Sequence, residues 1–275
     1  MMQAGLASKP RLNWVRTSTE KPETVVLIHA VGHDLTYWDR QIEALRDEYN
    51  VVAFDLPGHG HSKRLPEHWS FDFTAAMVAE LIEQTSTTPV HLVGISFGGM
   101  IAQVTTVAHP ELVRSLTLIS TASHFLDAAR EVLRARAVTV RTGGMHAVVQ
   151  TSLERWFTPE TRRQRPDIVD RITKTLLGDD AATHAAIWDL ISELDISRRL
   201  GEIRCPTLIL GGEHDPSTPP NVAYGLFDSI PGATIKIIPN ASHIVTVEAP
   251  AAVNAALAAF LSQIVDRSHD LSFHE

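Results

Sequence analysis

Short apolar runs alternate with amphipathic stretches over the first 120 residues, and this alternation restricts the possible folds more than any other feature. The runs are rich in leucine and β-branched residues and lack apolar–polar alternation, which is typical of strands buried on both faces. They lie at residues 24–29, 51–55, 90–94 and 115–120. Between them, apolar residues recur at the spacing of amphipathic helices over residues 36–49 and 74–85. This order predicts a parallel sheet with right-handed crossovers.

The pattern changes after residue 121. From there to residue 200 the chain has helical spacing and many arginines but no run that predicts a strand. The strand pattern returns at residues 205–212 and 233–239, and residues 249–265 have the spacing of an amphipathic helix. This last helix should pack back on the sheet, because its apolar face needs a buried partner.

The simplest architecture is one α/β core with a helical insertion. We expect residues 1–121 and 201–275 to form the core, a mostly parallel sheet flanked by helices, and residues 122–200 to form the insertion. Such an insertion is too long for an ordinary connection, and long excursions are usually lids or binding elements.

Charge and hydrophobicity exclude several classes of function. Acidic residues outnumber basic ones by 32 to 24, which gives a formal net charge of −8, whereas a nucleic-acid surface needs clustered basic residues. No segment approaches about 18 continuous apolar residues, and the start of the chain lacks the long apolar core of a secretion signal. The single cysteine, Cys205, cannot form an internal disulfide and fits a reducing compartment. We expect a cytoplasmic protein that binds neither nucleic acid nor membrane, with a homo-oligomer left open.

Fourteen histidines raise the question of a metal site. The sequence contains neither the H-E-x-x-H pattern nor a pair of cysteine ligands. His59 and His61 lie two positions apart in HGHS, but no further Asp-His pair follows to complete a metallohydrolase cluster. Because ligand number decides such sites, we expect no metal and no cofactor.

The segment VGISFGGM places Ser96 between glycines, at the end of a predicted strand and the start of a predicted helix. One interpretation is a flexible turn, and the other is the strained bend that exposes a nucleophile in the pattern G-x-S-x-G. Such a bend has no room for side chains two residues before and after the serine, which explains Gly94 and Gly98. A helix beginning at Phe97 would direct unpaired N–H groups toward the serine oxygen. We therefore predict Ser96 as a nucleophile.

A serine nucleophile needs a base, and the base needs an orienting acid. In proteins with this motif the acid follows the serine, and the histidine follows the acid. Asp215 lies just beyond the strand predicted at residues 205–212, and His243 lies in the loop beyond the last strand. All three residues thus follow the carboxyl ends of parallel strands, where ligand sites of such sheets lie.

Alternatives remain for the acid and the base. Asp215 precedes a proline and is also typical of a turn, and Glu213 is the nearest competing acid. His243 is also consistent with a surface loop histidine. His214 is less suited to be the base, because it adjoins the acid and precedes the last strand.

Two further loops follow early strands. In HAVG, at residues 29–32, Val31 is the expected donor of a backbone N–H to a developing oxyanion, alongside Phe97. DLPGHGHS, at residues 55–62, is a tight turn after the next strand. Its histidines precede the nucleophile in the chain, which favours a structural role for them over a catalytic one.

Together these segments resemble the α/β-hydrolase superfamily, and within it the 3-oxoadipate enol-lactonases. The resemblance extends from about residue 24 to residue 262, and it rests on HAVGHDLTYWDRQIEAL, DLPGHGHS, GISFGGMIAQ, GGMHAVVQTSLERWFTPETR and GGEHDPSTPP. The stretch LERWFTPE is the most specific, since it lies in the insertion, where members of the superfamily differ most.

The resemblance implies an α/β-hydrolase fold and a hydrolase of small esters or lactones that works through an acyl-enzyme without a cofactor. Ser96, Asp215 and His243 would form the catalytic triad, with Val31 and Phe97 as oxyanion donors. The insertion would be a helical cap over the site. Candidate substrate contacts are His33, Trp38, Arg136, Arg141, Trp156 and Trp188.

The oxyanion loop departs from the family pattern. Enol-lactonases usually carry serine and asparagine there, as in S-N-S-L-G, whereas this chain has IHAVG at residues 28–32, followed by His33 in place of a smaller residue. These differences leave open the substrate and the roles of His29 and His33. Three other functions also remain open on the same residues: carbon–carbon bond hydrolysis, cofactor-free perhydrolase activity and ligand binding by a receptor built on this fold.

The insertion offers a clue to the substrate. Residues 128–144 carry Arg130, Arg134, Arg136 and Arg141 in a chain of negative net charge. A solvated helix face explains most such residues, yet an enol-lactone-like substrate has a carboxylate that arginine binds with two parallel hydrogen bonds. Helical spacing groups Arg130, Arg134 and Arg141 near one face and points Arg136 elsewhere. The resemblance favours Arg136 and Arg141, which lie where the family has basic residues.

Overall fold

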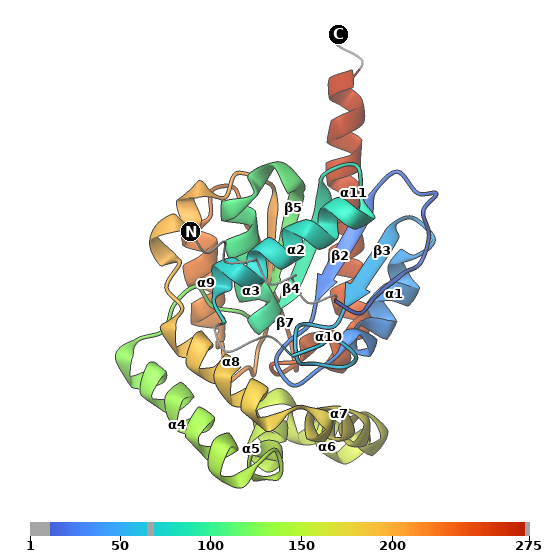
Figure 1. Cartoon of the computed structure of the whole chain (residues 1–275). Coiled ribbons are helices and arrows are strands. Elements are labelled where there is room, and N and C mark those ends of the chain that lie inside the picture. The colour runs from blue at the N-terminus through green and yellow to red at the C-terminus, as the bar shows by residue number, and fades with distance from the viewer. Residues whose placement is uncertain (1–11, 65–68, 273–275) are drawn as a thin grey trace, which may run out of the picture.

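The computed structural model describes residues 12–64 and 69–272 (Figure 1). The strands are β1 (Trp14–Arg16), β2 (Thr24–Ile28), β3 (Asn50–Phe54), β4 (Val90–Ile95), β5 (Val113–Ile119), β6 (Thr207–Gly212) and β7 (Thr234–Ile238). The α-helices are α1 (Asp39–Leu45), α2 (Phe71–Thr85), α3 (Phe97–Ala108), α4 (Asp127–Gly143), α5 (His146–Trp156), α6 (Pro159–Gln164), α7 (Pro166–Gly178), α8 (Ala181–Glu193), α9 (Pro220–Ser229), α10 (Val245–Glu248) and α11 (Pro250–Ser272). Three short 3-10 helices are η1 (Leu35–Trp38), η2 (Pro110–Leu112) and η3 (Ser197–Glu202).

The sequence predicts neither a secretion signal nor a membrane-spanning helix. The first eleven residues, on which most of the prediction about a secretion signal rests, lie outside the described residues. Within residues 12–64 and 69–272, no helix combines the length and the apolar character needed to cross a bilayer.

The strands form one sheet in the order β1-β3-β2-β4-β5-β6-β7. β1 runs antiparallel to β3, and all other neighbouring strands are parallel, so that Val26 of β2 lies opposite Val52 on one side and Leu92 on the other. Each parallel strand overlaps one of the runs found in the sequence. These runs were recognisable because β2, β3, β4 and β6 are buried along their whole length and are therefore apolar at nearly every position. The predicted mostly parallel α/β sheet is confirmed.

Strand β1 is absent from the sequence prediction. It has three residues and pairs only with β3 at the edge of the sheet. Trp14 and Val15 are 40% and 43% exposed, so the strand has no buried face and leaves no hydrophobic pattern.

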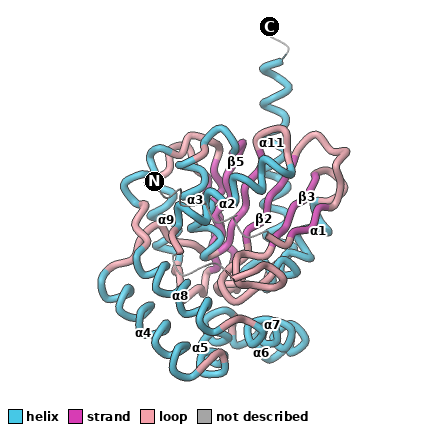
Figure 2. Tube along the Cα trace, in the orientation of Figure 1, coloured by secondary structure: helices cyan, strands magenta, loops and turns pink. Residues whose placement is uncertain are grey.

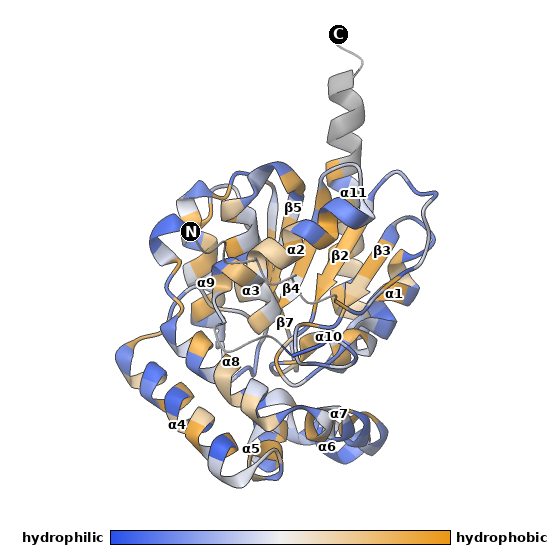
Figure 3. Cartoon of the chain, viewed as in Figure 1, coloured by the Kyte–Doolittle hydropathy of each residue, from blue (hydrophilic) through white to orange (hydrophobic). Residues whose placement is uncertain are grey.

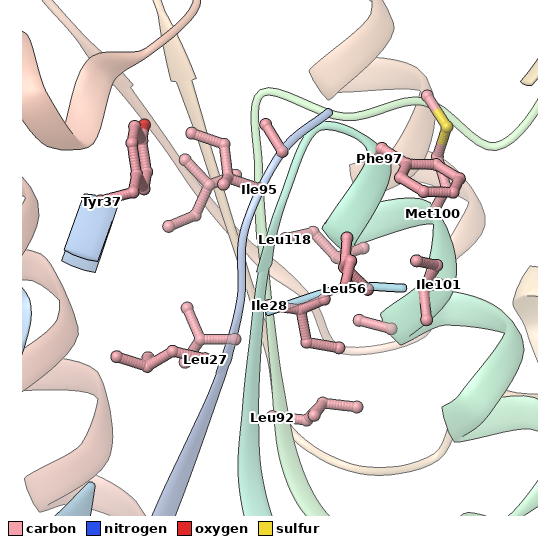
Figure 4. Packing of buried hydrophobic residues seen from close by; sticks show 14 of the residues in the cluster. Leu27, Ile28, Tyr37, Leu56, Leu92, Ile95, Phe97, Met100, Ile101 and Leu118 are labelled. Carbon is pink, nitrogen blue, oxygen red and sulfur yellow. The ribbon is translucent and has the colours of Figure 1, made fainter. Parts of the chain in front are cut away.

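Helices cover both faces of the sheet, as Figure 2 shows. α2 and α3 pack together on one face, and α1 and α11 pack together on the other. In the close view of Figure 4, Phe97 and Ile101 of α3 lie on one side of the strands, and Leu27 and Tyr37 lie on the other. Figure 3 shows apolar residues concentrated in the central strands and polar residues on the outer faces of the helices. The core is therefore two apolar layers with the sheet between them.

Helices α4–α8, which we call the helical segment, lie between β5 and β6 in the chain. Figure 1 shows them as a layer beyond one end of the sheet. α4 and α8 pack along each other, and α5 packs against both α4 and α7. An isolated bridge pairs the backbone of His124 with that of Asp195, close to where the segment leaves and rejoins the core. All five helices fall within residues 122–200.

Candidate active site

Ser96 occupies the bend between β4 and α3 and has the strained backbone angles φ 53° and ψ −117°. A β-carbon on Gly94 would lie 2.3 Å from the carbonyl oxygen of Gly98. A β-carbon on Gly98 would lie 2.2 Å from the carbonyl oxygen of Ile28. Neither approach is sterically possible without moving the backbone, so both positions require glycine. The predicted bend is present, and it holds the serine at the carboxyl end of a central strand.

A chain of hydrogen bonds joins Ser96, His243 and Asp215. His243 Nε2 lies 2.9 Å from Ser96 Oγ, and His243 Nδ1 lies 2.8 Å from Asp215 Oδ2. All three side chains are buried. Because the carboxylate accepts the Nδ1 proton, Nε2 is free to accept the proton of the serine hydroxyl. The sequence pattern that singled out these residues thus corresponds to three side chains in contact.

The surroundings of Asp215 keep it ionised. Its Oδ1 accepts hydrogen bonds from the N–H groups of Ser217 at 2.8 Å and Thr218 at 3.0 Å, and its Oδ2 accepts from Thr218 Oγ1 at 2.7 Å. Burial by itself would raise the pKa of Asp215, but the charge of His243 and the hydrogen bonds from His243 and Thr218 outweigh it and hold the pKa below its ordinary value. An ionised carboxylate in this place orients the imidazole and stabilises its charged form.

The competing acid and base lie elsewhere. The side chain of Glu213 is half exposed and accepts a hydrogen bond from the Asn240 N–H at 2.9 Å. His214 is 56% exposed and lies beside Glu213 rather than beside Ser96. The geometry therefore favours Asp215 as the acid and His243 as the base over these neighbours.

The two expected oxyanion donors belong to segments that adjoin the serine. Phe97 is the first residue of α3 and directly follows Ser96, so its N–H belongs to the unpaired first turn of that helix. Val31 lies in the loop after β2 and lines the cavity that contains Ser96. The positive end of the α3 dipole adds to the attraction for a developing negative charge at this point.

A cavity of about 270 Å³ opens beside the triad. The helical segment supplies one wall, which includes Leu133, Arg136, Arg155, Trp156, Trp188 and Ile191. The core supplies the floor, with Ser96, His243 and the loop that contains Val31. A larger groove of about 760 Å³ is lined by residues of α1, α7 and α11 and by none of the triad, so volume alone does not identify the site.

The aromatic candidates divide between cavity and core. Trp156 and Trp188 line the cavity. Trp38 does not, and this corrects the sequence prediction: its indole is fully buried in the core, where its ring lies 5.3 Å from that of Tyr37. His33 is also buried outside the cavity, with its ring 4.6 Å from Tyr37 and 4.7 Å from Trp156. It therefore contacts a wall residue rather than the cavity itself.

Two guanidinium groups face the cavity. Arg136 of α4 stacks on the Trp188 ring, with its central carbon 4.3 Å from the ring centroid, and Arg155 of α5 lies 5.9 Å from the same centroid. Burial lowers the pKa of Arg155 to about 10, which leaves it charged at neutral pH. Sequence reasoning missed Arg155, although it directly precedes Trp156 in the stretch LERWFTPE.

The other arginines of α4 have structural partners. Arg141 pairs with Asp189 on α8, which corrects its prediction as a substrate contact. Arg130 donates hydrogen bonds to the carbonyl oxygens of Phe125, Ser192 and Leu194 and so ties α4 to the end of α8. Arg134 pairs with Glu131 at 2.7 Å in solvent. No three His, Cys, Asp or Glu side chains in the described part of the chain are grouped as a metal site.

His29 and His33 are expected to make the fold sensitive to acid. Burial lowers the pKa of His33 to about 3 and that of His29 well below its ordinary 6.5. Below pH 6.5 the unfolded chain therefore protonates these two histidines while the native protein keeps them neutral. Burial also lowers the pKa of His184 to about 4 and raises that of Asp179 to about 6, and these two groups change stability in opposite directions near pH 5. Stability should therefore be greatest above pH 6.5 and fall as the pH is lowered toward 5, by about 1.4 kcal/mol per pH unit for each histidine that stays neutral in the native protein. Urea unfolding at several pH values measures this slope.

The variant His33→Gln is the control for this prediction. It removes one titrating histidine, so the slope near pH 5 should fall by about 1.4 kcal/mol per pH unit. A free energy of unfolding that is the same at pH 7 and pH 5 in the parent protein would contradict the prediction.

Comparisons with known proteins cover nearly the whole chain. The family described as alpha/beta hydrolase fold matches residues 23–250. The chain is 30% identical to 3-oxoadipate enol-lactonase 2 of Acinetobacter baylyi, over 92% of this chain and 93% of the relative. It is 29% identical to the (E)-2-((N-methylformamido)methylene)succinate hydrolase of the same organism, over 87% of this chain and 90% of the relative.

Solved structures agree with these relatives. The enol-lactonase from Burkholderia xenovorans LB400 superposes with a TM-score of 0.87 at 27% identity, over 91% of this chain and 96% of that one. The thermophilic esterase from Thermogutta terrifontis, described with malate bound, superposes with a TM-score of 0.86 at 28% identity, over 92% of this chain and 93% of that one.

Proposed function

The chain belongs to the α/β-hydrolase fold family and is a hydrolytic enzyme, and from this premise we propose that it is a serine hydrolase of small esters or lactones that carry a carboxylate. The observation that carries the proposal is the hydrogen-bonded chain from Ser96 through His243 to Asp215, with distances of 2.9 and 2.8 Å. An isolated serine hydroxyl is a poor nucleophile, and such a chain is what activates it.

The reaction begins when Ser96 Oγ attacks the substrate carbonyl and its proton passes to His243 Nε2. Asp215 stabilises the resulting imidazolium, and the N–H groups of Val31 and Phe97 bind the oxyanion. His243 then gives the proton to the leaving oxygen as the acyl bond breaks. Water, deprotonated by His243, attacks the acyl-enzyme and releases Ser96 with the acid product. In a lactone the leaving oxygen stays attached to the product.

The helical segment acts in this proposal as a cap. Its residues form one wall of the cavity, and the triad lies on the opposite side. A volume of about 270 Å³ suits a small substrate, since pockets for drug-sized ligands range from roughly 300 to 1,000 Å³. Removal of bulk water by the cap strengthens the electrostatic interactions at the carbonyl.

The charge of the cavity supports an anionic substrate. Arg136 and Arg155 both face Trp188 in the wall, and no ion pair joins either of them to a carboxylate among the residues that the structure describes. A guanidinium group beside an apolar wall is stabilised most by a partner of opposite charge. A carboxylate suits it, because its two oxygens can accept two parallel hydrogen bonds from the guanidinium. The succinate named for one relative and the malate bound to the Thermogutta esterase are consistent with this class of ligand.

Removal of these cations should weaken the binding of anionic substrates selectively. Arg136→Met and Arg155→Met are each expected to raise KM for an anionic lactone at least tenfold, about 1.4 kcal/mol, and to spare a neutral ester of similar size. Steady-state kinetics on the two substrates measures the difference. Arg134→Met is the matched control, because it removes an exposed α4 arginine that lies outside the cavity.

Two results would contradict the anionic substrate. One is an equal response of both substrates to the Arg136 and Arg155 variants. The other is a preference of the parent enzyme for neutral esters. Either result leaves the serine mechanism in place and assigns the cavity to apolar substrates.

A further inference from the structure

Three buried histidines surround the loop that carries Val31, and the mechanism proposed above uses none of them. His29 and His33 flank the loop, and His59 comes from the turn that follows β3. Each is at most 1% exposed. Burial of three imidazoles around one short loop is costly unless their nitrogens are paired, so the partners of these nitrogens indicate what the rings do.

His29 fixes the peptide unit that contains the Val31 N–H. Its Nε2 accepts a hydrogen bond from the Leu56 N–H at 2.9 Å, which places the ring proton on Nδ1. Nδ1 then donates to the Ala30 carbonyl oxygen at 2.7 Å. The Ala30 carbonyl and the Val31 N–H belong to one planar peptide and point in opposite directions. Holding the carbonyl therefore sets the direction of the N–H.

His59 holds the next peptide along the same loop. Its Nε2 accepts the Gly32 N–H at 3.2 Å, and its Nδ1 donates to the Pro57 carbonyl oxygen at 3.2 Å. Gly32 has φ +80°, a conformation that glycine both adopts and leaves easily, so hydrogen bonds must restrain the peptide between Val31 and Gly32. His59 holds its N–H, and His33 Nδ1 lies 3.0 Å from its carbonyl oxygen on Val31. The rings of His59 and His29 meet edge to face with their centroids 5.1 Å apart.

The helical segment closes over this arrangement. Asp179, between α7 and α8, lies with its carboxylate 3.8 Å from His59 Nε2 and accepts a hydrogen bond from His184 Nδ1 at 3.0 Å. A β-carbon on Gly32 would lie 2.9 Å from both the Leu176 and the Trp156 side chains. His59 is thus enclosed between its own turn, the Val31 loop and the helical segment.

We propose that His59 is a positioning residue: with His29 it holds the Val31 N–H in the direction that binds the oxyanion. The inference rests on the proposed function, in which Val31 is an oxyanion donor. An N–H that binds only the oxyanion contributes to the transition state and not to substrate binding. Loss of the His59 acceptor should therefore lower kcat and leave KM nearly unchanged.

Two substitutions at His59 separate positioning from packing. His59→Leu removes the acceptor for the Gly32 N–H, and His59→Gln keeps an acceptor near the position of Nε2. We expect the leucine variant to lower kcat on a small ester by about tenfold or more, and the glutamine variant to stay within about threefold of the parent, both with KM within about twofold. Phenylboronic acid, which forms a tetrahedral adduct with an active serine, should bind the leucine variant about tenfold more weakly.

His91→Leu is the matched control. His91 is fully buried on β4, five positions before Ser96, and its Nδ1 lies 2.8 Å from Ser115 Oγ, away from the Val31 loop. This variant should lower Tm and leave kcat and boronic acid binding close to those of the parent. A second readout is independent of activity: in NMR experiments the Gly32 amide proton should exchange about tenfold faster in His59→Leu than in His91→Leu.

The inference fails if His59→Leu keeps kcat and boronic acid affinity within about twofold of the parent, or if KM alone rises. It also fails if the Gly32 amide exchanges equally in the two leucine variants. A parent protein that neither turns over esters or lactones nor binds the boronic acid would refute the proposed function instead, and the exchange of the Gly32 amide would still decide whether His59 holds the loop.

Discussion

Replacing Ser96 with alanine is expected to remove nearly all hydrolysis and to leave the fold intact. kcat on a small ester should fall by roughly 10⁴ to 10⁶, the loss typical of a triad member, because the attacking oxygen is gone. The hydroxyl makes its hydrogen bond with His243 and none that holds β4 to its neighbours, so Tm should change little. Ester turnover and thermal melting measure the two parts of this prediction.

Ser123→Ala provides the matched control for Ser96. Ser123 is also buried, lies just beyond β5 and has its Oγ 3.2 Å from His124 Nδ1, away from the triad. Its alanine variant should keep turnover close to that of the parent. A Ser96→Ala protein that retains a tenth of the parental kcat would rule out the serine mechanism.

Asp215→Asn is expected to lower kcat by roughly 10⁴. The two backbone N–H groups of Ser217 and Thr218 donate to Oδ1, so an asparagine would keep its oxygen there and turn its NH₂ group toward His243. An N–H facing Nδ1 favours the tautomer with its proton on Nε2. In that tautomer Nε2 has no lone pair for the serine proton, and the base is lost.

Glu213→Gln is the control for the acid. Its side chain is half exposed, and its hydrogen bond from the Asn240 N–H survives the change to an amide. kcat should therefore stay near that of the parent. If Glu213→Gln proves more damaging than Asp215→Asn, the acid of the triad is misassigned.

Local sequence determined the sheet and the bend. The parallel strands are buried on both faces, so each needs a run of apolar residues, and such runs are visible without knowledge of their neighbours. The bend at Ser96 requires glycine two residues before and after it for steric reasons that act within a few residues. The order of strands also put Ser96, Asp215 and His243 at one edge, because carboxyl ends of parallel strands meet there.

Features that leave no local pattern could not be predicted from the sequence. Strand β1 is short and exposed, so nothing in its residues distinguishes it from a loop. Large aromatic residues suit both pocket walls and cores, so the sequence does not decide between the two for Trp38. The packing of η1 places it in the core. His29 accepts a hydrogen bond from Leu56 of the other loop, and His59 accepts one from Gly32, so these contacts are set by how β2 and β3 pair.

The arginines of α4 show which features the local sequence does not determine. The buried residues Leu133, Ala137 and Val140 form one stripe along the helix. At about 100° per residue, Arg136 falls on one side of this stripe, and Arg130, Arg134 and Arg141 fall on the other, as the sequence predicts. The sequence thus determines on which side of the stripe each arginine lies, but not what each side contacts. Only the packing of α4 along α8 turns the Arg136 side toward Ser96 and Arg141 toward Asp189, because the orientation of a helix depends on the surface against which its apolar stripe is buried.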